Sequence, residues 1–177
     1  MEVSKPNLEA TSAVCLFVNG LIFVFYAISI PALIHGVHWL ITLAAALFIV
    51  ALPAIYQYLG RIHKGAANAA KAAIGLFGMG MILIVASDVM FVSSSLPRLT
   101  HDLVYVFGNA LFVISLFAIG ALAWKRGFPK WLGVLSIVTG IIGVLTYVPG
   151  AFVVIVPSLL LLGAWSFTMA FALRTSK

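Results

Sequence analysis

The chain has 177 residues, of which 64% are hydrophobic and only 8% are charged. This composition excludes a water-soluble globular domain, in which about 45–50% of residues are apolar and about 25% are charged. The formal net charge of +6 does not indicate nucleic-acid binding, because the cations lie in short links and at helix ends, where they orient a chain in a lipid bilayer and attract anionic headgroups.

The apolar runs predict a bundle of transmembrane α-helices. A span needs roughly 20 mostly apolar residues, and charges, Pro and Gly interrupt the runs at about that spacing. The alternation typical of outer-membrane barrels is absent from the sequence. We therefore expect one all-α, polytopic membrane domain over residues 1–177, with six spans at about 11–34, 38–59, 72–92, 102–124, 130–148 and 151–173.

The distribution of Lys and Arg predicts the orientation. With six spans, the links 60–71 and 124–130 and both ends of the chain lie on one side. Together they carry all ten Lys and Arg residues except Arg98. Cytoplasmic links are enriched in Lys and Arg. We therefore expect both termini in the cytoplasm of a prokaryotic cell, with the chain embedded in its plasma membrane.

Histidines occur at the first and second outer links. His35 and His38 lie between the first two spans, and His101 lies just before the fourth. Imidazole nitrogens, with nearby carboxylates, are ligands for divalent metals, zinc first among them. The sequence leaves two alternatives, a metal site at the outer face and interfacial histidines that only form hydrogen bonds.

The third and fourth spans carry polar residues inside their apolar runs. Asp88 lies about four residues, or roughly 6 Å, from the outer end of the third span. Asp102, Tyr105 and Asn109 are spaced i, i+3 and i+7 and share one face of the fourth span. Since a carboxylate in apolar surroundings needs hydrogen-bond donors or takes up a proton, we expect Asp88 to face Tyr105 and Asn109. Such a cluster could be a ligand or proton site or a structural contact.

The fifth span presents a face of small residues. Gly133, Ser136, Gly140 and Gly143 recur at steps of three and four residues, and small residues let two helix backbones approach closely. The partner could be another helix of the same chain. It could also be a second copy or another subunit, which would make the protein a homo-oligomer or part of a membrane complex.

Residues 123–145, AWKRGFPKWLGVLSIVTGIIGVL, resemble a segment of bacterial multi-pass membrane proteins grouped as a domain of unknown function. The link YQYLGRIHKGAANAAKAAIGLFG, residues 56–78, and the stretch from Pro157 to Trp165 are similar to the same family. The family often has an acidic residue early in its last helix, where this chain has Ser158. Because the family has no established activity, the resemblance implies only a helical membrane fold over about residues 11–173.

Three functions are compatible with these patterns. The first is a non-enzymatic accessory or interaction subunit, or a binder of a small ligand at the outer face. The second is a small proton-coupled transporter that uses Asp88. The third is a metal-dependent enzyme that uses His35, His38, His101 and the two aspartates. Because the sequence contains neither a phosphate-binding loop nor a nucleophile elbow, nothing in it demands catalysis.

Overall fold

The computed structural model describes residues 5–29, 38–62, 67–93, 97–124, 129–146 and 151–175. Within these ranges the chain is all-helical, which confirms the predicted class. Its elements are α1 (Lys5–Ser29), α2 (His38–Ile62), α3 (Ala67–Ser93), α4 (Arg98–Ala123), α5 (Lys130–Leu145), the short 3₁₀ helix η2 (Ala151–Val154) and α6 (Ile155–Thr175).

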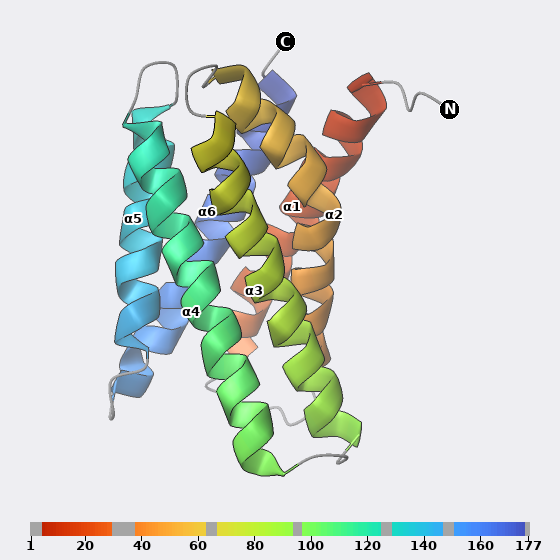
Figure 1. Cartoon of the computed structure of the whole chain (residues 1–177), viewed down its shortest axis with the longest axis vertical. Helices are drawn as coiled ribbons and strands as arrows, with labels where there is room; N and C mark the ends of the chain where they lie inside the picture. The colour runs from red at the N-terminus through yellow and green to blue at the C-terminus, as the bar shows by residue number, and fades with distance from the viewer. Residues whose placement is uncertain are drawn as a thin grey trace.

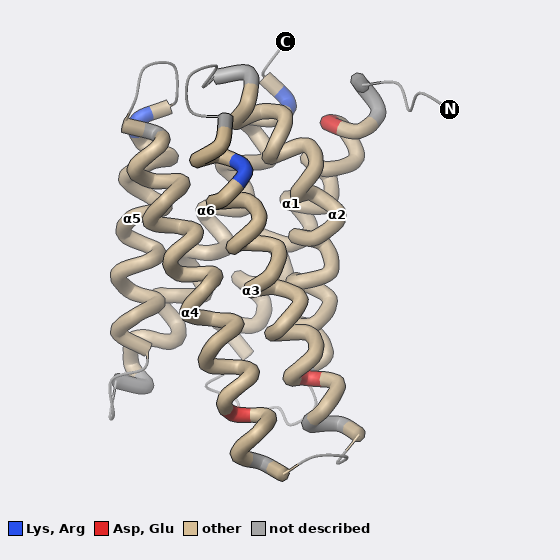
Figure 2. The backbone as a smooth tube through the Cα atoms, viewed as in Figure 1, with Lys and Arg blue, Asp and Glu red and all other residues tan. Residues whose placement is uncertain are grey.

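The six α-helices run alternately up and down and form a closed ring (Figure 1). Each helix packs against its neighbours in the chain, and α6 packs extensively against α1. Helix α1 begins and α6 ends at the same end of the bundle, which we call the basic end, because Lys71, Lys130 and Arg174 lie at the corresponding ends of α3, α5 and α6 (Figure 2). Asp88 and Asp102 lie at the opposite end, which we call the Asp88 end.

Five of the helices are long and apolar enough, by length and composition, to cross a membrane. Their outward faces carry large apolar side chains, among them Phe17, Leu21 and Phe25 on α1 and Leu103 and Phe107 on α4. A soluble protein rarely exposes a contiguous apolar patch larger than a few hundred Å². The apolar helices and their outward surface therefore indicate a membrane-embedded protein.

Helix α5 is shorter than the span predicted for it. It has 16 residues and ends at Leu145, with Thr146 as its cap, whereas the sequence suggested a span over 130–148. At 1.5 Å per residue it rises about 24 Å, less than the roughly 30 Å of a hydrocarbon core. Beyond the cap, residues 147–150 lie outside the described ranges, and the chain continues in η2 and α6.

Aromatic side chains fill the middle of the bundle. Phe48, Phe77, Phe112 and Trp165, from α2, α3, α4 and α6, form what we call the aromatic core. Ring centroids lie 5.1 Å apart for Phe48 and Phe77, 5.0 Å for Phe77 and Phe112, and 5.8 Å for Phe77 and Trp165. These spacings are those of attractive aromatic pairs, so the core joins four helices of the ring.

The small face of α5 packs inside the chain. The Trp165 indole Nε1–H of α6 donates to the Ser136 hydroxyl over 2.8 Å. On the other side, a methyl group on Gly140 would lie 3.2 Å from the Phe117 ring of α4, and one on Gly143 would lie 3.2 Å from Val113. Of the two partners considered for Gly133, Ser136, Gly140 and Gly143, the structure places α4 and α6 of the same chain there.

Helices α3 and α4 approach each other closely at Gly80 and Gly108. A methyl group on Gly80 would lie 2.7 Å from the Gly108 carbonyl oxygen, and one on Gly108 would lie 3.0 Å from the Gly80 oxygen. The two backbones are therefore in contact at this pair. Nearer the Asp88 end, the Ser87 hydroxyl donates to the His101 carbonyl over 3.3 Å. Together these contacts set the register of the two helices and hence the position of the residues beyond the crossing.

Candidate functional site

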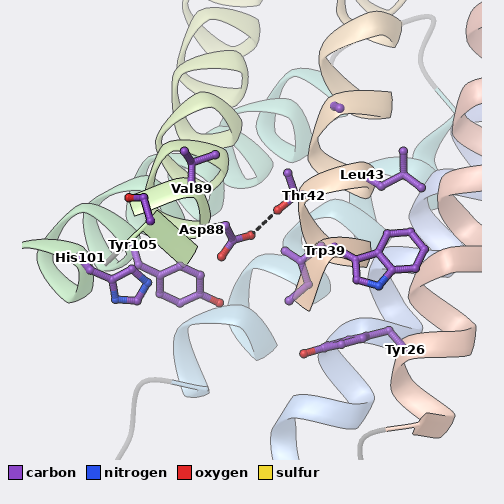
Figure 3. Close-up of a pocket in the computed structure, with 11 residues that line it drawn as sticks. Tyr26, Trp39, Thr42, Leu43, Asp88, Val89, His101 and Tyr105 are labelled. Carbon is purple, nitrogen blue, oxygen red and sulfur yellow. Dashed lines mark hydrogen bonds between the residues drawn. The ribbon is translucent and has the colours of Figure 1, made fainter. Parts of the chain in front are cut away.

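A cavity of about 780 Å³ opens at the Asp88 end of the bundle (Figure 3). Four helices contribute to it: Tyr26 from α1; Trp39, Ile41, Thr42, Leu43 and Ala46 from α2; Asp88, Val89 and Ser93 from α3; His101 and Tyr105 from α4. Its volume is within the range of about 300–1,000 Å³ typical of small-molecule sites, which combine apolar walls with a few polar groups.

Asp88 supplies the carboxylate of this cavity. Its Oδ2 atom accepts a hydrogen bond from the Thr42 hydroxyl over 2.8 Å, which links α3 to α2. In Figure 3 the carboxylate and Thr42 lie at the centre of the lining residues. A carboxylate has about four lone-pair sites on its two oxygens, so Asp88 can accept more hydrogen bonds than the one from Thr42.

Aromatic side chains flank the carboxylate on both sides. Tyr26 and Tyr105 approach from α1 and α4, with both hydroxyls directed toward the space beside Asp88, and Trp39 lies next to Tyr26 (Figure 3). Aromatic rings attract cations through their faces. Trp39 and Val89 are also 62% and 58% exposed, so the wall of the cavity is open toward the outer surface of the bundle.

His101 and Asp102 form a pair at the rim. The His101 Nδ1 lies 2.8 Å from the Asp102 Oδ1, and the side chains of the two residues are 18% and 54% exposed. The His101 ring stacks on Tyr105 with centroids 6.4 Å apart. His101 therefore lines the cavity beside Tyr105, while Asp102 faces outward and serves as its partner.

The expected contact between Asp88 and Asn109 is wrong. The Asn109 amide donates to the carbonyl of Tyr105 over 2.9 Å, and Asn109 lines a separate cavity of about 50 Å³. The register of α3 and α4 explains the error. Gly80 lies opposite Gly108 and Ser87 opposite His101, so Asp88 is level with about residue 100, and Asn109 lies about 13 Å further along the bundle.

Of the three histidines proposed as metal ligands, the structure describes the side chain of one, His101. His35 lies outside the described residues, and His38 is the first residue of α2, with a side chain that is also outside them. Among the described residues, no group of three or more His, Cys, Asp or Glu could hold a metal ion. The His101 imidazole and the Asp102 carboxylate lie together, but as a pair they are fewer than the three ligands of such a group.

The contribution of α1 and α2 to this cavity was not predicted from the sequence. Thr42 lies four residues into α2, and Asp88 lies five residues before the end of α3, so the two are at matched depth. Thr42 is also the only hydroxyl residue in the first half of its predicted span. Depth matching across antiparallel helices could have identified Thr42, Tyr26 and Trp39 as neighbours of Asp88.

In comparisons with protein-family models, curated proteins and solved structures, none matches this sequence. The resemblance of residues 123–145 to a family of bacterial membrane proteins stays a prediction.

Proposed function

We propose that the protein is an integral membrane protein that binds a small apolar ligand with one cationic amine, seated on Asp88. The observation that carries the proposal is the Asp88 carboxylate, hydrogen-bonded to Thr42, in the wall of a cavity of about 780 Å³. A protonated amine would pair with the carboxylate, and its apolar part would occupy the remaining walls.

The composition of the walls supports an amine over other ligand classes. The described lining contributes one carboxylate and no Lys or Arg, so an anionic ligand would meet a carboxylate and no permanently charged cation among these residues. The rings of Tyr26, Trp39 and Tyr105 favour a cation beside them. A charge-assisted hydrogen bond in apolar surroundings is also stronger than one in water.

The location of the cavity supports access from the outer leaflet. The described Lys and Arg side chains lie at the basic end (Figure 2), which by the positive-inside rule is cytoplasmic. The Asp88 end would then face the outside of a prokaryotic plasma membrane. An amphiphilic amine concentrates at the lipid headgroups, and the exposed Trp39 and Val89 leave the cavity open toward the surrounding lipid.

The test is a binding measurement on the full chain in lipid nanodiscs, with empty nanodiscs as background. The probe is a fluorescent aryl alkylamine, and its N-acetylated, neutral analogue reports the contribution of charge. Loss of a charge-assisted pair costs about 1.5–3 kcal/mol, so Asp88→Asn should weaken amine binding by roughly tenfold to a hundredfold.

Asp102→Asn is the matched control, because Asp102 is a carboxylate at the same end of the bundle but faces outward. It should leave the affinity within about twofold, since an exposed ion pair contributes about 0–1 kcal/mol. Equal binding of the amine and its neutral analogue, or equal losses in the two variants, would refute the proposal.

Transport is a second candidate, favoured by polar residues along α1. Ser12, Asn19 and Tyr26 are spaced by seven residues and so share one helix face. Ser12 and Asn19 are 0% exposed, and their side-chain polar atoms lack hydrogen-bond partners among the described residues. This stripe leads from the cavity toward the basic end, where a path would have to open.

Proton-driven amine uptake into proteoliposomes should be abolished by Asp88→Asn, and an unchanged rate would remove this candidate.

A further inference from the structure

A second cavity, of about 50 Å³, lies between α4, α5 and α6 and shares no lining residue with the first. Its polar lining comes from all three helices: Asn109 from α4, Thr139 and Thr146 from α5 and its cap, and Ser158 from α6. One water molecule needs roughly 10–15 Å³ of such space. By this measure the cavity has room for about three to five waters, or for a small ion with a few waters.

Both threonine hydroxyls around this cavity donate their only hydrogen elsewhere. The Thr139 hydroxyl donates to the Leu135 carbonyl over 2.7 Å, and the Thr146 hydroxyl donates to the Gly143 carbonyl over 2.6 Å. The Asn109 amide likewise donates to the carbonyl one turn earlier in its own helix. A hydroxyl that has donated its only hydrogen has just lone pairs left, and the carboxamide oxygen is always an acceptor. The two threonines can therefore offer only oxygen lone pairs, and Asn109 can offer those of its carboxamide oxygen.

The end of helix α5 adds to this negative potential. Gly143 and Thr146, at its C-terminal end, line the cavity. A helix C-terminus carries a partial negative charge from its aligned peptide dipoles. In transporters with interrupted helices, the C-terminal ends of short helix segments hold cations in this way.

The geometry points to a binding site for a monovalent cation of the size of Na⁺, held by the side-chain oxygens of Asn109, Thr139, Thr146 and Ser158. Hard cations prefer oxygen ligands. The described lining contains no Asp, Glu, Lys, Arg or His. Among those residues nothing would offset the desolvation of a divalent ion, while neutral oxygens suffice for a single charge. This site is independent of the amine site proposed above.

The test is equilibrium dialysis of the purified full chain in detergent against ²²Na⁺. It is paired with thermal unfolding in NaCl and in CsCl at the same ionic strength, because Cs⁺ is a monovalent cation too large for the site and not an amine. We expect saturable binding that approaches one Na⁺ per chain, and a higher Tm in NaCl than in CsCl. Equal Tm in the two salts, or ²²Na⁺ retention no greater than in protein-free micelles, would overturn the site and leave the cavity a place for water.

Two variants locate the ion. Thr139→Val and Ser158→Ala each remove one oxygen from the cavity and should lower the Na⁺ affinity at least fivefold. The matched control is Thr168→Val on α6, whose hydroxyl also donates to a carbonyl of its own helix, that of Ala164, but which does not line the cavity. Na⁺ binding that is equally strong in all three variants would place the ion elsewhere and refute the assignment. The dialysis result on the unaltered chain decides the question even where a variant fails to fold.

Discussion

Replacement of Gly80 by Ala tests whether the crossing of α3 and α4 builds the Asp88 cavity. The added methyl group would lie 2.7 Å from the Gly108 carbonyl oxygen and 2.8 Å from the Phe112 nitrogen. Both are backbone atoms, so no side-chain rotation relieves the clash. To restore an ordinary contact of 3.4 Å, the helices must separate by about 0.7 Å. Overpacking of this kind costs about 1–3 kcal/mol.

Gly75→Ala is the matched control on the same helix, because a methyl group on Gly75 meets nothing within 4 Å. Both substitutions gain up to about 1 kcal/mol of helix propensity, so the difference between the variants isolates the clash. We expect Gly80→Ala to be less stable than Gly75→Ala by about 1–3 kcal/mol in SDS-induced unfolding and to bind the amine probe more weakly. Gly78→Ala, which meets only the end of the Leu52 side chain, should fall between them. Equal unfolding midpoints for Gly80→Ala and Gly75→Ala would refute the inferred contact.

Further substitutions address individual contacts. Asn19→Leu replaces a buried polar side chain that has no partner among the described residues, so it should raise stability by about 1–3 kcal/mol in thermal unfolding; a loss of stability would show that Asn19 is satisfied. Trp165→Phe removes the donor to Ser136 and should lower the free energy of unfolding by about 1–3 kcal/mol. A double-mutant cycle with Ser136→Ala should show that the two effects are coupled, and purely additive effects would contradict the hydrogen bond. Thr42→Val removes the donor that orients Asp88 and should weaken amine binding about fivefold by calorimetry, whereas unchanged affinity would show that the carboxylate needs no such support.

The fold class could be predicted because it depends on composition and run length, which need no knowledge of contacts. The faces of the helices could not. In a soluble helix the apolar stripe marks the buried face. Here apolar side chains point both into the bundle and toward its outer surface: on α1, Phe23 is 7% exposed and Phe25 is 57% exposed. Without a polar face to mark the outside, the sequence did not show that α6 closes the ring on α1 or that α2 supplies Thr42.

The site was predictable to the extent that it depends on depth along one helix. Asp88 and Tyr105, which were expected to face each other, line the same cavity because both lie near the end where α3 and α4 are joined. His101, predicted only as a metal ligand or an interfacial histidine, lines it too. The error over Asn109 came from the helix boundary. The predicted span began at 102, whereas α4 begins at Arg98, directly after Pro97, which adds about 6 Å of helix between Asn109 and the Asp88 end. Tyr105 still reaches the cavity because helical side chains lean toward the N-terminus of their helix, which for α4 is the Asp88 end. The same lean directs Asn109 back along α4 toward the carbonyl of Tyr105, so one turn of helix separates a residue of the amine cavity from a residue of the smaller, oxygen-lined one.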